Sequence, residues 1–231
     1  MTYAAHMRLA LVAAALVVIV TLLAVFTDID VAISDALYGL QGSWPVSHAH
    51  GPLRLFFYDG PIWLLGLLAI GLAAGAAFPR LLEPTGLTRR ESLFALTCLI
   101  ATPVLVGTLK DLSGVACAYD LARYGGTLSD ELGRYPFMHP DAGRCWPAAH
   151  PSGAFALLCL GALHRPRHVR RGLWLLALGA GLVLGAYQVA RGAHFVSHVI
   201  ITALVAQVVA SAAAALLLSR PQREMTSSPP M

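Results

Sequence analysis

Five long apolar runs constrain this chain more than any other feature of its sequence. They occupy residues 9–26, 62–78, 93–109, 172–189 and 195–218. Each approaches or exceeds the length that an α-helix needs to cross about 30 Å of hydrocarbon. The composition agrees, because charged residues make up 12% of the chain, against about 25% in soluble domains. The sequence therefore predicts a membrane protein built from helices.

A sixth apolar run, residues 153–163, is too short to span by itself and reaches spanning length only if it begins near Trp146. We count it as a span over residues 146–163. The predicted fold is then an all-α, polytopic membrane protein: one six-helix transmembrane bundle over residues 1–231 with long outward-facing loops. The N-terminal run lacks a cleavage pattern and is interpreted as a retained anchor, and residues 224–231 are predicted to be a disordered tail.

The arginines predict the orientation, since Lys and Arg near span ends favour the cytoplasmic side. They lie before the first run, in the second and fourth connections, and in the tail: Arg8, then Arg80, Arg89 and Arg90, then Arg165, Arg167, Arg170 and Arg171, then Arg220 and Arg223. Six spans bring all four groups to one side, with both termini cytoplasmic. The net charge of +4 is small and scattered, which argues against a nucleic-acid partner.

Ionisable residues gather at the opposite, outward ends of the spans. Lys110 ends the third run, His150 opens the fourth, and Arg191 and His194 lie in the turn between the last two. On a helix, Arg191, His194 and His198 share one face. Convergence of these side chains is one interpretation. The other has Arg191 reaching the headgroups and the histidines acting as interfacial hydrogen bonders.

A converged group of this kind suits a phosphate. Ser152 and Gly153 follow Pro151 at a predicted helix start, where backbone N–H groups can bind an anion beside Lys110 and Arg191. One neutral imidazole can attack phosphorus while a second, protonated imidazole supplies a proton to the leaving oxygen. Fixed cations can stabilise the transferred group, so we expect no metal and no cofactor.

Two cysteines, Cys117 and Cys145, lie in the long outward segment. An oxidising exterior would permit a disulfide between them. The alternative is two small buried residues.

The stretches "GTLKDLSG", "CWPAAHPSGAF" and "RGAHFVSH" resemble the three motifs of the type 2 phosphatidic acid phosphatase family, which shares its site with vanadium haloperoxidases. The resemblance runs from Lys110 to His198. It departs from the family pattern where Gln188 stands at the usual arginine and His198 at the usual aspartate. Arg191, one turn beyond Gln188, could supply the missing guanidinium, and His198 or Asp120 could orient His194. The departures are similar to those of a divergent bacterial branch.

The resemblance implies a metal-independent phosphatase at the outer face of a bacterial cytoplasmic membrane, acting on a phosphorylated membrane lipid within the bilayer. His194 would form a phosphohistidine, and His150 would protonate the leaving group. Two alternatives remain open. A phosphotransferase would use the same cavity but another acceptor, and a carrier or scaffold would not react at all.

Overall fold

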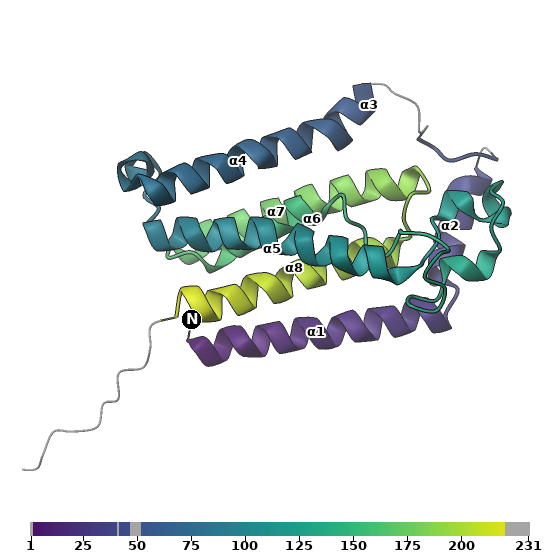
Figure 1. Ribbon diagram of the computed structural model, residues 1–231, viewed down its shortest axis with the longest axis horizontal. Coiled ribbons are helices and arrows are strands. Elements are labelled where there is room, and N and C mark those ends of the chain that lie inside the picture. The colour runs from purple at the N-terminus through teal and green to yellow at the C-terminus, as the bar shows by residue number, and fades with distance from the viewer. Residues whose placement is uncertain (1, 41, 47–51, 220–231) are drawn as a thin grey trace, which may run out of the picture.

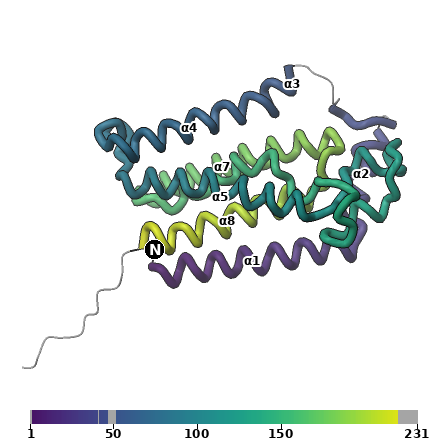
Figure 2. Tube along the Cα trace, in the orientation of Figure 1, coloured from purple at the N-terminus to yellow at the C-terminus, as the bar shows by residue number. Residues whose placement is uncertain are grey.

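The computed structural model describes residues 2–40, 42–46 and 52–219, and the regular structure within these ranges is helical. Five long helices lie side by side (Figure 1 and Figure 2). They are α1 (Tyr3–Phe26), α4 (Gly60–Ala77), α5 (Arg89–Ser113), α7 (Arg167–Ala190) and α8 (Val196–Leu217). All five belong to segments long and apolar enough to cross a membrane. The prediction of an all-helical protein with several spans is therefore confirmed.

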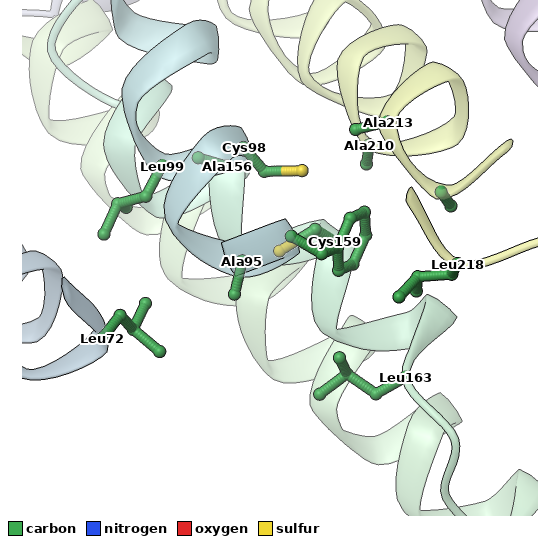
Figure 3. Packing of buried hydrophobic residues seen from close by; sticks show 12 residues of the cluster. Leu72, Ala95, Cys98, Leu99, Ala156, Cys159, Leu163, Ala210, Ala213 and Leu218 are labelled. Atoms are coloured by element: carbon green, nitrogen blue, oxygen red, sulfur yellow. The ribbon is translucent and has the colours of Figure 1, made fainter. Parts of the chain in front are cut away.

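The central helix is α8, which contacts α1, α5, α6 and α7. Small buried residues such as Ala206, Ala210 and Ala214 line it, and they let the neighbouring backbones approach closely. In Figure 3, Ala210 and Ala213 of α8 lie opposite Cys98 of α5 in one buried cluster. The outer helix α1 instead exposes its large apolar side chains, as a lipid-facing helix does.

The fourth predicted span, residues 146–163, is shorter than the prediction. Its helical part is α6 (Ser152–Ala156) followed by a 3-10 helix, η6 (Leu157–Ala162), while residues 146–151 are not helical. The segment nevertheless follows the length of α5. The N–H of Cys145 donates to Val115 beyond one end of α5 at 2.9 Å, and the N–H of His164 donates to Glu91 at the other end at 2.8 Å. The six-span count remains a prediction.

The long connections pack together at the end of the bundle that carries Lys110, called here the site end (Figure 1). Helix α2 (Ile29–Gly39) meets the segment 114–151, which contains η3 (Ala118–Asp120), η4 (Ala122–Tyr124) and η5 (Asp130–Gly133). The Arg123 guanidinium donates to Asp35 at 2.6 Å, and Tyr38, Trp44 and Tyr124 pack ring against ring. The predicted tail, residues 224–231, lies outside the described residues.

Glu91 joins the C-terminal end of the short fourth segment to the start of α5. Its side chain is buried, and its carboxylate accepts hydrogen bonds from the N–H groups of Thr88, at 3.0 Å, and His164, at 2.8 Å. We predict that Glu91→Ala lowers the free energy of unfolding by about 2 kcal/mol, because both donors lose their acceptor. Thermal unfolding in detergent measures the change. The exposed Glu83→Ala is the control, and equal effects of the two variants would contradict the prediction.

Candidate active site

A cavity of about 780 Å³ at the site end, called here the histidine cavity, brings together four residues that are distant in sequence. Lys110 comes from the last turn of α5, His150 precedes α6, Arg191 ends α7, and His194 precedes α8. Ser152, Gly153, Asp120, Cys117 and Cys145 also line it. The cavity thus includes every residue of the predicted site except His198.

His194 is held by a backbone atom. Its Nδ1 lies 2.7 Å from the carbonyl oxygen of Cys145, which fixes Nδ1–H as the donor and leaves the lone pair on Nε2. Burial, and after it the neighbouring His198, holds the pKa of His194 well below its ordinary value. The ring is therefore neutral at neutral pH, as a nucleophilic imidazole must be.

The orienting partner of His194 differs from the prediction. His198 does not line the histidine cavity. Its own Nδ1 lies 2.7 Å from the same Cys145 carbonyl, whose two lone pairs can accept both bonds. The acceptor at Nδ1 of His194 is thus the Cys145 carbonyl oxygen. A carbonyl takes the place of a carboxylate here because the chain at Cys145 brings its carbonyl oxygen within hydrogen-bond distance of both rings.

Cys145 is itself fixed by a disulfide. It is bonded to Cys117 across 28 residues, with 5.1 Å between the Cα atoms, and its N–H donates to Val115 at 2.9 Å. Both cysteines line the histidine cavity. Of the two alternatives that the sequence left open, the disulfide is present, and it anchors the carbonyl that holds the histidines.

The start of α8 is secured by Asp30 of α2. Phe195 precedes the helix and has no side-chain oxygen to cap it. The buried Asp30 carboxylate accepts instead from the N–H of Ser197, at 2.9 Å, and from its hydroxyl. Asp30 is not among the site residues predicted from the sequence. The available signal in the sequence was a helix that begins after a phenylalanine, since such a helix needs a capping side chain from another segment.

His150 is positioned by the segment that leads into α4. Its Nε2 lies 2.9 Å from the carbonyl of Phe57, so Nε2–H is the donor and Nδ1 remains for other contacts. The ring of Tyr58 stacks on it, with centroids 4.1 Å apart. Burial lowers the pKa of His150, although the Phe57 carbonyl acts in the opposite direction.

Arg191 is buried next to Gln188, the residue at the family's usual arginine position. Its Nη1 donates to the Gln188 side-chain oxygen at 3.3 Å, and its guanidinium carbon lies 5.6 Å from the ring centroid of Tyr58 and 5.4 Å from that of Tyr187. The following Gly192 has φ of 68° with Trp44 packed where a Cβ would lie. A side chain there would displace the turn that carries Arg191 and His194.

Ser152 departs from its predicted role. Both its N–H, at 3.1 Å, and its hydroxyl, at 2.6 Å, donate to the carbonyl of Ala149. These donors are therefore committed within the chain and not directed at a phosphate. The reason is the short turn before α6, which folds Ser152 back on Ala149. Gly153 lines the histidine cavity next to Leu65 of α4.

The PAP2 superfamily model matches residues 91–221, more than half of the chain. The chain belongs to the PAP2 superfamily. The matched range contains Lys110, His150, Arg191 and His194, so the family match and the histidine cavity coincide. Members of this superfamily are generally metal-independent phosphatases. Searches of curated proteins and of solved structures found no significant match.

This PAP2 superfamily protein has further cavity residues that sequence analysis missed. Arg54 and Tyr58 come from the segment that leads into α4, and Arg144 adjoins Cys145. Arg54 pairs with Asp59 at 3.3 Å and lies over Tyr58. The lining residues of the cavity thus include four cations, the other two being Lys110 and Arg191, and one acid, Asp120. Arg144 is paired with Asp111 at 3.6 Å, as Arg54 is with Asp59, so the excess of cations is smaller than the lining residues alone indicate but still favours an anionic ligand. No group of three potential metal ligands occurs within the described ranges.

Removing the disulfide of this PAP2 superfamily protein tests whether the position of the Cys145 carbonyl matters for activity. We predict that the double variant Cys117→Ser, Cys145→Ser loses roughly 10-fold or more in turnover, because small displacements of a reacting group are costly. Phosphate release in detergent, with and without reductant, measures it. Reductant should reproduce the loss in the unmodified chain and have no further effect on the variant. Cys98→Ala, which removes a buried free thiol, is the control; full activity of the double variant would contradict the prediction.

Proposed function

We propose that this chain is an integral membrane lipid phosphate phosphatase that hydrolyses a phosphomonoester or pyrophosphate lipid through a phosphohistidine. The observation that carries the proposal is the histidine cavity, in which His194 and His150 share one space with Lys110 and Arg191. Membership of the PAP2 superfamily supports the same reaction class. The arginine distribution supports a cavity that faces outward.

The shape of the cavity favours a lipid over a soluble phosphate. Beyond the charged residues, its wall is apolar, formed by Ile62, Leu65 and Ala69 of α4 and by Leu99 and Pro103 of α5. Leu99 lies eleven residues before Lys110 on one helix, which corresponds to roughly 16 Å along its axis. The cavity therefore extends from the charged end far into the depth of the bundle. A phosphate headgroup with an attached hydrocarbon chain fits both parts.

In the proposed first step, the Nε2 lone pair of His194 attacks phosphorus. An N–P bond forms, and the bond from phosphorus to the leaving oxygen breaks. His150, protonated at both nitrogens, keeps Nε2–H on the Phe57 carbonyl and gives the Nδ1 proton to the leaving oxygen. Lys110 and Arg191 balance the charge on the remaining phosphoryl oxygens.

In the second step, neutral His150 takes a proton from a water molecule, whose oxygen attacks phosphorus. The N–P bond breaks, its electron pair returns to Nε2 of His194, and inorganic phosphate leaves. His150 is then protonated again, so the cycle closes without a further reactant. The Cys145 carbonyl keeps Nδ1–H of His194 in place throughout.

The nucleophile assignment predicts that His194→Ala loses phosphate release by roughly 10³-fold or more. The measurement is phosphate release by the purified protein in detergent against lipid monophosphates and lipid pyrophosphates. The exposed His139→Ala is the matched control and should keep full activity. Release by His194→Ala near the unmodified level would remove the assignment. Release without an added hydroxyl acceptor separates hydrolysis from phosphotransfer, and a carrier or scaffold would release none.

The acid–base assignment predicts an acidic pH optimum. Burial lowers the pKa of both histidines, so His194 stays neutral at mildly acidic pH, while His150 loses its proton as pH rises through a value below about 6.5. We expect kcat/KM to fall as pH increases above about 6.5. His150→Asn should be slow and lack this alkaline decline. A kcat/KM that rises up to pH 8 would contradict the assignment.

A further inference from the structure

Two adjoining cavities lie at the end of the bundle opposite to the histidine cavity. Their volumes are about 410 and 520 Å³, and both are lined by His6, Ala162 and Arg170. His6 lies near the start of α1 and Arg170 near the start of α7. Because α7 ends at the histidine cavity, this pair of cavities, called here the arginine cavities, is a separate site near the opposite membrane boundary.

The arginine cavities carry positive charge that the described residues do not balance. Arg165, Arg167, Arg170 and Arg171 line them. Arg165 lies 3.7 Å from Glu91 and donates to the Gly86 carbonyl at 2.6 Å. For the other three, no ion pair occurs within the described part of the chain, and Nε of Arg170 is buried without a hydrogen-bond partner. A buried guanidinium nitrogen in this position favours an anion.

The arginine cavity of about 410 Å³ has an apolar wall. Leu9 of α1, Leu158 of η6, Ala210 of α8 and Trp174 of α7 form it. The indole N–H of Trp174 donates to the side-chain oxygen of Gln207, another lining residue, at 3.0 Å, so its polar atom already has a partner within the protein. Helices α1 and α7 each pack against α8, and the cavity lies between them.

We propose that the arginine cavities bind an anionic phospholipid, with the headgroup phosphate among Arg167, Arg170 and Arg171 and part of an acyl chain against Leu9 and Trp174. Guanidinium groups match phosphate geometry, and basic pockets between membrane helices bind anionic headgroups. A soluble anion would use the charges but not the apolar wall. The arginine-rich end assigns this lipid to the cytoplasmic leaflet. The lipid is a bound ligand distinct from the substrate, so the inference does not rest on the proposed reaction.

Thermal unfolding of the full chain in detergent tests the site. The probes are dioctanoyl phosphatidylglycerol, dioctanoyl phosphatidylcholine and inorganic phosphate. We expect phosphatidylglycerol at about 100 times its dissociation constant to raise Tm by on the order of 5 °C, with smaller shifts from the other two. Arg170→Gln should lose most of the rise. The double variant Arg167→Gln, Arg171→Gln changes only exposed side chains and should lose most of it as well, even where Arg170→Gln folds poorly.

The matched control is Arg80→Gln, Arg89→Gln, which removes two exposed arginines at the same end of the bundle but outside both cavities. It should keep the full rise. An equal loss of the Tm rise in the control would show that general charge attraction causes the rise, and would overturn the proposal. A rise with phosphatidylcholine or with inorganic phosphate that equals the rise with phosphatidylglycerol would also overturn it. Because phosphate release is not the readout, failure here leaves the proposed reaction untouched.

Discussion

The carbonyl oxygen of Cys145 accepts hydrogen bonds from Nδ1 of His194 and of His198, each at 2.7 Å. Two further contacts hold that oxygen and the two imidazole rings in place. The disulfide to Cys117 fixes the carbonyl from one side, and Asp30 fixes the first turn of α8 from the other through Ser197. A backbone carbonyl carries no formal charge. It therefore fixes the tautomer of a buried imidazole while favouring its protonation less than the charge of a carboxylate would.

The non-helical residues 146–151 create the space in which the site lies. A buried non-helical stretch is stable only where the protein satisfies its backbone. Helix α8 does so, since Ala148 N–H donates to the His198 carbonyl at 3.3 Å and the Thr202 hydroxyl donates to the Ala148 carbonyl at 3.0 Å. A full-length helix over residues 146–163 would have filled the position of His150 with a regular turn. In the structure His150 lies instead in a turn that lines the histidine cavity.

Charge is divided between the two ends of the bundle. At the site end, cations of four segments, including Lys110 and Arg191, converge on one cavity with a single lining carboxylate. At the opposite end, arginines of the α7 start surround an apolar wall. Both groups of side chains are positively charged, but they line cavities with different neighbours. The site end adds His150 and His194, and in the proposed reaction His194 attacks phosphorus. His6 lines the arginine cavities instead.

The apolar runs by themselves determined the helices, because the length and hydrophobicity that cross a bilayer are local properties of a segment. Lys110, His150 and His194 could also be proposed from their positions at span ends. Tertiary structure alone decided what lies between them. The partner of His194 is a peptide oxygen, which residue type cannot reveal, and Tyr58 reaches His150 only because α4 packs against α5. Such contacts join segments distant in sequence, so only the folded chain defines them.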